Sequence, residues 1–374
     1  MGRMMQKSLL PFLLTAVSLE CAAVGQVAFL PSNSILNALP NITTSTVPSN
    51  GDLNPYGVAF VPAGFPSGGT IVAGDVLVAN FNASSNQQGT GTTIVSISPD
   101  GQQSLFATSK VIGVDTALGV LSRGFVLVGN IPVTYPNNVS TPGPGSLQVF
   151  DRNGNLVSTI TDAAFLSSPW GMTINDLGSS AQVYVSNLSG TVTRLNFLVS
   201  SADLTLESKT QIASGYGSQL IPAIVGIGPT GLAYDSVRDI LFVASTADNG
   251  IFEIENASTR TLDAGKGFEI YADSTNLHGP LGLTLGPNGN LITANGDAVN
   301  AGGMQNALVE FTEQGNYVAT YQVDSGAAGA AFGVASTSWQ GAVRFAAVDD
   351  DSNAITVWTL RPPAVSGTTA SSGM

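Results

Sequence analysis

Short apolar runs, separated by turn-forming Gly, Asn, Asp and Pro, dominate the pattern of hydrophobic and polar positions along almost the whole chain. Many runs are almost continuously apolar and rich in Val, Ile, Leu, Phe and Thr, whereas the helix formers Glu and Lys are scarce. Continuous apolar runs of this kind are typical of strands that are buried on both faces of a sheet. The pattern therefore predicts an all-β protein.

One short pattern recurs six times, with a glycine preceded by a mostly apolar residue and followed by alternating apolar positions. The glycines stand at intervals of roughly 50 to 60 residues, and they are Gly57, Gly119, Gly171, Gly231, Gly282 and Gly333. Each is followed by a second β-prone run, such as DVLVANF or QVYVSNL, and in most copies by a third. This period predicts a six-bladed β-propeller with four-stranded antiparallel blades. Sandwich hairpins are the alternative, but a sandwich does not require six copies in register.

The last repeat provides only three of the four strands that a blade needs. These strands are predicted at Phe332–Ser336, Val343–Val348 and Ala354–Leu360. An open ring would leave a strand edge unpaired, which is a liability for a β-protein. The β-prone segment Gln26–Leu30 has no partner of its own, so we expect it to close the ring as the outer strand of the sixth blade. The propeller then spans 26–362, and 363–374 forms a disordered tail.

The chain begins with the features of a secretory signal peptide. Arg3 and Lys7 precede the apolar run Ser8–Leu19, which is too short to span a bilayer and is followed by small residues. Cleavage after Ala23 or Gly25 fits this pattern, so 1–25 is predicted to be a removable signal.

The single cysteine, Cys21, falls inside this predicted signal and raises the alternative of a lipid anchor. Glu20 stands directly before it, where bacterial lipid-attachment motifs carry a small residue. We therefore favour a freely exported protein, located outside the cell, in the periplasm or at the cell surface. No later segment is apolar for long enough to form a transmembrane helix.

Charge and composition narrow the classes of partner. The 374 residues carry 12 Lys and Arg against 25 Asp and Glu, which gives a net charge of −13. Nucleic acid is excluded as a partner, because its phosphates require clustered basic residues. A single His makes a His-rich zinc centre implausible. We expect a monomer that binds a protein or a polysaccharide.

The repeat units resemble known propeller families. PYGVAF, PTGLAY and GPLGLTLGPNGNLITANG resemble NHL repeats, and VYVSNLSGTVTRLN, at Val183–Asn196, resembles a YVTN-type repeat. The resemblance covers Asn54–Leu360 and implies a six-bladed propeller. The wider group includes gluconolactonase-like hydrolases, a streptogramin lyase and protein-binding modules, so the resemblance does not choose among activities.

Polar residues are predicted to gather at one mouth of the central channel. In a propeller, the segments leading into first strands and the turns after second strands lie on the same face. Ligand-binding candidates on that face are Asn54, Asp115, Asn187, His278 and Asn295. Carboxylate and amide oxygens suit a hard cation such as Ca²⁺, for which the candidate ligands are Asp115, Asn295 and Asp349. The alternative is that these side chains cap strand ends and turns.

Two further features leave alternatives open. His278 is the only imidazole, and it is either a general base or a solvent-facing loop residue. The segment Pro132–Gly145 contains too many Pro and Gly residues for regular structure. It either forms a lid or a contact with a partner, or it is disordered.

The resulting hypothesis is an exported binding module without a catalytic residue. Lactonase-like relatives hold their metal with Glu among the ligands, and no Glu stands at the corresponding positions here. The alternative hypothesis is a divalent-metal-dependent, lactonase-like hydrolase with its site at the channel mouth.

Overall fold

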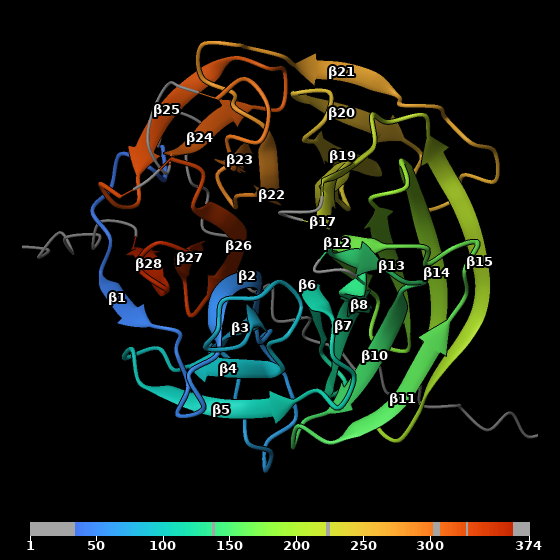
Figure 1. Ribbon diagram of the computed structural model, residues 1–374, viewed down its shortest axis with the longest axis vertical. Helices are drawn as coiled ribbons and strands as arrows, with labels where there is room; N and C mark the ends of the chain where they lie inside the picture. Colours follow the sequence, from blue (N-terminus) through green and yellow to red (C-terminus); the bar gives the residue numbers. More distant parts are fainter. Residues whose placement is uncertain (1–33, 137–138, 222–224, 302–306, 327, 362–374) are drawn as a thin grey trace, which may run out of the picture.

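The computed structural model describes residues 34–136, 139–221, 225–301, 307–326 and 328–361. Throughout these residues the regular elements are β-strands, and none of them contains a helix able to span a membrane. Six four-stranded antiparallel sheets surround a central channel (Figure 1). The predicted six-bladed propeller is thus confirmed. The predicted signal peptide and tail, 1–25 and 363–374, lie outside the described residues.

Each blade begins with a strand next to the channel and ends with a strand at the rim. Blade 1 contains β2 (Leu53–Phe60), β3 (Val76–Asn82), β4 (Thr93–Ile97) and β5 (Gln103–Thr108). Blade 2 contains β6 (Val114–Leu121), β7 (Phe125–Ile131), β10 (Ser146–Asp151) and β11 (Leu156–Thr161). Blade 3 contains β12 (Pro169–Asp176), β13 (Ser180–Asn187), β14 (Thr191–Val199) and β15 (Leu204–Ser214).

The second half of the chain repeats this order. Blade 4 contains β18 (Pro229–Asp235), β19 (Ile240–Ser245), β20 (Gly250–Glu255) and β21 (Phe268–Tyr271). Blade 5 contains β22 (Pro280–Leu285), β23 (Asn290–Asn295), β24 (Ala307–Thr312) and β25 (Tyr317–Gln322). Blade 6 contains β26 (Ala331–Trp339), β27 (Ala342–Asp349), β28 (Ala354–Leu360) and β1 (Ile42–Ser45).

The ring is closed by an N-terminal strand, but not by the one that the sequence suggested. β1 pairs antiparallel with β28, with Thr43 opposite Thr356, and takes the outermost place in blade 6. Gln26–Leu30 lies outside the described residues, so the closing strand has to be corrected to Ile42–Ser45. The Thr-rich β1 alternates between exposed and half-buried positions. An edge strand of this kind carries a weaker apolar signal than Gln26–Leu30.

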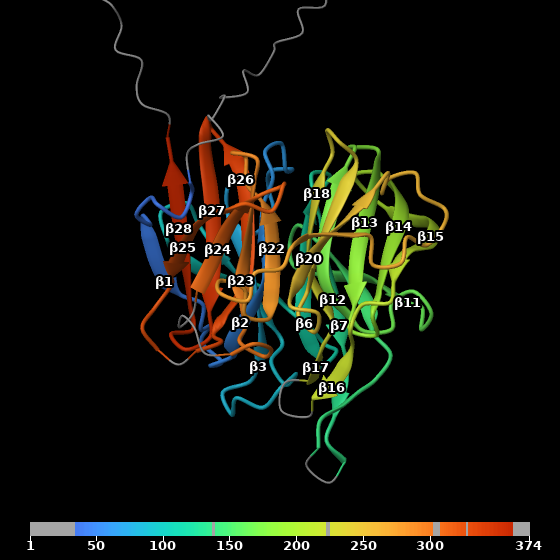
Figure 2. The same cartoon turned by 90° about the horizontal axis from the view of Figure 1, so that it is seen from above.

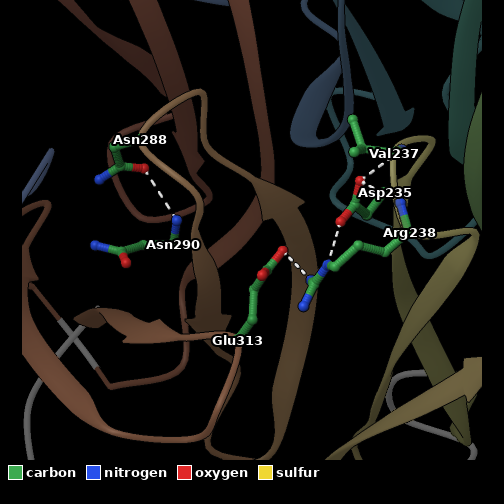
Figure 3. Close-up of polar contacts among 6 residues, drawn as sticks. All are labelled: Asp235, Val237, Arg238, Asn288, Asn290 and Glu313. Atoms are coloured by element: carbon green, nitrogen blue, oxygen red, sulfur yellow. Dashed lines mark hydrogen bonds and ion pairs between the residues drawn. The ribbon is translucent and has the colours of Figure 1, made fainter. Parts of the chain in front are cut away.

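The segment before β1 is anchored on blade 5 by the buried side chain of Glu310. This carboxylate accepts hydrogen bonds from the Ser34 hydroxyl at 2.6 Å and from the backbone N–H groups of Ile35 and Leu36, each at 3.1 Å. The side-chain amides of Asn288 and Asn290, labelled in Figure 3, donate to it at 2.8 Å. We call Glu310, Asn288 and Asn290 the N-terminal latch.

An ion-pair cluster links blades 4 and 5 on the same face of the ring (Figure 3). Arg238, in the turn after β18, contacts Asp235 of its own blade at 2.5 Å. It also pairs with Glu313, which follows β24 in blade 5. The arginine side chain is 37% exposed, so solvent screening limits the contribution of these pairs to stability.

The apolar core is divided among the junctions between blades. Six clusters of buried residues each join two neighbouring blades. A seventh cluster instead brings side chains of several blades together at one end of the channel. Burial on both faces explains why the inner strands are almost continuously apolar.

Glycine is required where the first strands meet at the channel. A Cβ atom on Gly171 would lie 1.8 Å from the Thr230 carbonyl oxygen of the next blade, and one on Gly333 would lie 1.7 Å from that of Tyr56.

Blade 2 departs from the predicted repeat. Its register places Ala117, not Gly119, at the position that glycine holds in the other blades. The assignment of Gly119 was therefore wrong by two residues.

Candidate functional site

A bulge at the start of each first strand turns one side chain toward the channel. The pairing of first and second strands shifts register there in all six blades. The residues in the shifted stretch, just before the inner glycine or alanine, are Tyr56, Thr116, Trp170, Thr230, Leu281 and Phe332. We call the face on which the first strands begin the mouth face.

Four of these side chains close the channel at the mouth face. Tyr56 stacks on Phe332, with ring centroids 5.3 Å apart, and meets the edge of Trp170 at 5.4 Å. The Trp170 indole donates a hydrogen bond to the Tyr56 hydroxyl at 2.6 Å. Leu281 belongs to the same cluster, and we call Tyr56, Trp170, Leu281 and Phe332 the channel plug. Burial raises the pKa of Tyr56 above its usual range, so its hydroxyl stays protonated.

The channel plug leaves little room at the mouth. The cavity that it shares with the inner glycines measures about 40 Å³, enough for a few water molecules. A larger cavity of about 220 Å³ lies among the other ends of the first strands, toward the opposite face. Small-molecule sites generally need several hundred Å³. The cavity beside the channel plug is therefore too small for an ordinary substrate.

The amides predicted to point into the mouth bind the backbone of their own blade instead. Asn187 accepts a hydrogen bond from the Ser168 N–H at 3.1 Å and donates to the Phe165 carbonyl at 3.2 Å. Asn295 likewise accepts from the His278 N–H at 2.9 Å. The second-strand amides that hold the segment leading into the first strand are Asn80, Asn130, Asn187 and Asn295. These contacts are those expected of strand-end caps.

Asn54 is buried between blades 1 and 6. Its backbone N–H donates to the Asn353 side chain at 2.7 Å, and its side-chain amide donates to Asp350 at 3.2 Å. The side-chain oxygen of Asn54 has no hydrogen-bond partner. Burial, followed by the charge of Asp351, raises the pKa of Asp350 to about 6.

Asp115 stands at a position where four other blades carry proline. It is 1% exposed, and one carboxyl oxygen accepts a hydrogen bond from Asn130 at 2.7 Å. The second oxygen has no partner. Burial raises the pKa of Asp115 to about 7, partly offset by the Asn130 hydrogen bond. A carboxyl group in this setting is protonated over much of the acidic range.

His278 is neither solvent-facing nor placed as a free base. It is 5% exposed, and its Nδ1 atom lies in hydrogen-bond contact with the Asn300 carbonyl. Its Nε2 atom lies 3.2 Å from the Thr275 carbonyl. The expectation of a solvent-facing loop residue was therefore wrong. The ring instead contacts two loops, and a neutral imidazole donates to only one of these two carbonyls at a time. A ligand-binding role stays a prediction.

The three candidate metal ligands come from different blades. Asp115 lies on blade 2, Asn295 on blade 5 and Asp349 on blade 6. Asp349 accepts a hydrogen bond from Ser352 at 2.8 Å, and burial together with neighbouring Asp324 raises its pKa to about 7. In the ranges that the structure describes, no three or more His, Cys, Asp or Glu side chains are grouped to hold a metal.

A groove on the mouth face of blade 3 was not foreseen from the sequence. Two short ribbons flank it, one formed by β8 (Val133–Thr134) and β9 (Thr141–Pro142), the other by β16 (Gln219–Ile221) and β17 (Val225–Ile227). We call this space of about 440 Å³ the ribbon groove. The expectation that Pro132–Gly145 lacks regular structure was wrong, since that segment forms β8 and β9.

The sequence does contain an indication of the ribbon groove, because two connections between strands are longer than in the other repeats. The segments PVTYPNNVSTPGPG and YGSQLIPAIVGIG lengthen two connections that other blades keep short. Both connections open on the mouth face, and Figure 2 shows β16 and β17 projecting at the end of the molecule away from the tip of β28. Long connections on a rigid scaffold are where binding surfaces are commonly built.

No family model and no curated protein matches the sequence. Among solved structures, the chain resembles an α-L-arabinofuranosidase from Fusarium graminearum, with a TM-score of 0.52 and 12% identity over 86% of this chain and 98% of that one. It also resembles a gluconolactonase from Xanthomonas campestris, with a TM-score of 0.50 and 10% identity over 83% and 87% of the two chains. The calcium-binding protein regucalcin from Agrobacterium tumefaciens gives a TM-score of 0.48 and 14% identity over 83% and 92%.

These similarities concern the fold. Identities this low carry no information about activity. The resemblance to NHL and YVTN repeats stays a prediction, because no family model matches.

Proposed function

We propose that this protein is an exported β-propeller that acts as a binding module for a protein or a polysaccharide. The channel plug is the observation that carries this proposal. Tyr56 and Trp170 are each 5% exposed and fill the end of the channel at which a propeller enzyme would hold its substrate. A catalytic site needs space together with functional groups that can reach the reacting atoms. The cavity that the plug shares with the inner glycines offers about 40 Å³, and most of its lining is glycine and apolar side chains.

The ribbon groove is the surface that best suits a partner. It is about ten times larger than the cavity at the channel plug, and it is open to solvent along Ser189 and Leu220. The groove is flanked by connections that depart from the repeat, whereas the ring beneath it follows the repeat closely. A rigid ring carrying a shaped surface is a common design for interaction modules.

Binding can be tested with isolated cell-envelope material from the source organism. The protein should co-sediment with the envelopes, and Leu220→Asp should lower the bound fraction at least fivefold, because it places a charge in the apolar wall of the groove. Val237→Asp is the matched control, since Val237 is 89% exposed in a turn on the opposite face. Treating the envelopes with protease or with glycosidases then separates a protein partner from a polysaccharide. Equal binding by all three proteins would contradict the proposal.

Export is supported by Arg3 and Lys7 before the short apolar run Ser8–Leu19. Expression of the full chain in a bacterial host, followed by cell fractionation, should place a shortened protein outside the cytoplasm. Deletion of 2–25 should keep it inside. Cys21→Ser should leave the location unchanged, because cleavage is expected after Cys21. Retention of the wild type at a membrane, released by Cys21→Ser, would instead identify a lipid anchor.

A metal-dependent, lactonase-like hydrolase is the second candidate. Its support is the raised pKa of about 7 at both Asp115 and Asp349, which suits proton transfer near neutral pH. The binding-module proposal expects no change in melting temperature between Ca²⁺ and EDTA, and no hydrolysis of glucono-δ-lactone. A clear shift with Ca²⁺, together with hydrolysis that Asp349→Ala abolishes, would overturn the binding-module proposal.

A further inference from the structure

The ribbon groove has strand edges on both of its walls. β9 contributes Pro142 to one wall, and β16 contributes Leu220, which is 66% exposed, to the other. Each ribbon has only two strands. Pro142 of β9 has no N–H to donate, so the edge that can pair with a further strand is that of β16, Gln219–Ile221, which pairs only with β17 among the described strands. An edge of this kind accepts an extended segment as an additional strand. The β16 wall of the groove is therefore suited to a polypeptide in extended conformation.

The lining of the groove selects against charge. Its lining contains the buried Leu188 and the hydroxyl groups of Ser167 and Ser189, whose oxygens lie 2.7 Å apart. None of the side chains that line the groove is charged, although the chain as a whole carries a net charge of −13. An ionised side chain entering this groove would lose hydration without gaining an opposite charge. An uncharged segment is the matching occupant.

This chain itself contains such a segment beyond the last described strand. The sequence of 362–374 is PPAVSGTTASSGM, which has no charged side chain and includes β-branched Val365, Thr368 and Thr369. Thirteen residues reach about 45 Å when fully extended. The segment is thus long enough, and of suitable composition, to lie along the groove as a strand.

The position of β28 identifies which copy supplies the segment. β28 ends beside Val343, at the start of β27, and so lies on the face opposite the mouth face. Blade 6 and blade 3 are also on opposite sides of the ring (Figure 1). The chain's own segment would have to cross both the width and the depth of the ring to reach its own groove. A second copy, placed with its β28 face toward the mouth face of the first, presents the segment directly.

We propose that the ribbon groove of one copy binds residues 362–374 of a second copy as an added strand. This inference rests on the proposed binding function and names the partner as another copy of the same chain. The contact joins two different surfaces, so each copy keeps one free groove and one free segment. Such head-to-tail contacts extend into chains of copies unless the geometry closes a ring.

The first experiment compares two lengths of the protein, 26–374 and 26–361, by sedimentation velocity at several concentrations. The described ring is closed without residues 362–374, so the shorter protein should fold. The longer protein should form dimers and larger species as its concentration rises, whereas the shorter one should sediment as a monomer. Identical sedimentation of the two lengths would overturn the proposal.

The second experiment titrates a fluorescent peptide of residues 362–374 into the 26–361 protein and follows anisotropy. The peptide should bind saturably, and Leu220→Asp should weaken binding at least tenfold. Val237→Asp should bind like the unmodified ring. A peptide carrying Thr368→Asp should also bind at least tenfold more weakly. Absence of saturable binding, or equal binding by Leu220→Asp, would overturn the proposal.

The two experiments also separate this inference from the function on which it rests. If the 26–361 protein binds envelope material through the groove but does not bind the peptide, the proposed binding function is supported and the proposed self-association is overturned. If the peptide binds and no envelope component does, the partner is another copy of the chain.

Discussion

Single atoms at the centre of the ring decide how closely the blades can approach one another. The inner glycines have no Cβ, and a Cβ on Gly171 or Gly333 would lie 1.8 or 1.7 Å from a carbonyl oxygen in the next blade, far inside van der Waals contact. The backbone is rigidly paired on both sides and cannot move aside without separating two blades. Ala117 shows that blade 2 tolerates one Cβ at the same place.

Gly333→Ala should therefore destabilise the protein strongly. We expect a loss of about 3 kcal/mol in the free energy of unfolding, as is found for overpacked cores, measurable by urea denaturation. Gly143→Ala is the matched control, because a Cβ there would have no neighbour closer than 3.6 Å. Equal stability of the two variants would contradict the tight approach of blades 6 and 1.

Among the elements, β1 and the segment before it hold the ring closed. β1 forms the outer edge of blade 6. Glu310 of the N-terminal latch accepts five hydrogen bonds, and the three from Ser34–Leu36 fix that segment to blade 5. Both oxygens of the Glu310 carboxylate accept hydrogen bonds, so each of the five surrounding donors has an acceptor. A buried charge with this many donors is stabilising only while all of them are present.

Glu310→Gln replaces one acceptor oxygen by an NH₂ group that faces other donors. We expect the free energy of unfolding to fall by about 2–4 kcal/mol, and cleavage between Ser34 and Ser45 by a dilute protease to become faster. Glu255→Gln, at an exposed position at the end of β20, should change stability by less than about 0.5 kcal/mol. Unchanged cleavage in Glu310→Gln would show that the latch does not hold this segment.

Across the whole molecule, the carboxyl groups with a clearly shifted pKa fall into two groups, one lowered and one raised. Ion pairs and hydrogen bonds lower the pKa of Asp235 and Asp248 despite partial burial. Burial raises the pKa of Asp115 and Asp349 to about 7 and that of Asp350 to about 6. The folded protein therefore binds more protons than the unfolded chain between about pH 4 and pH 7.

Stability should accordingly fall as the pH rises from about 4 to 7, because groups with a raised pKa stabilise the fold only while protonated. Asp115 alone accounts for at most about 4 kcal/mol over this range. Thermal melting at pH 4.5, 6 and 7.5 should show a decreasing melting temperature, and Asp115→Asn should flatten the decrease. A wild-type melting temperature that rises over this range would contradict the burial of these carboxyl groups.

The period of the repeats made the ring predictable, because each blade needs the same strand lengths and turns. The register of blade 2 was not predictable, since TALGVLS contains an apolar-Gly-apolar pattern displaced by two residues from the structural position. The closing strand was also missed, because pairing with β28 depends on contacts more than 300 residues away, and the short run ITTS carries no such information.

The candidate site was predictable in composition but not in geometry. Asn187, Asn295 and Asp115 do lie at the strand ends where the sequence placed them, yet the sequence does not reveal that backbone groups occupy the two amides. One pattern in the sequence does indicate the channel plug. Aromatic residues stand directly before the inner glycine in NPYG, SPWG and AAFG, and a bulge at that point turns them toward the channel.

The pairing of β1 with β28 sets an order of events for the newly made chain. Thr43 and Thr356, which face each other in blade 6, are separated by 313 positions. The ribosome makes the first of these partners long before the second, so the edge of the last blade cannot be completed until β28 has been made. Contacts this distant slow folding and lengthen the time during which strand edges are exposed. The ring of a newly made chain therefore stays open at blade 6 until β28 has been made.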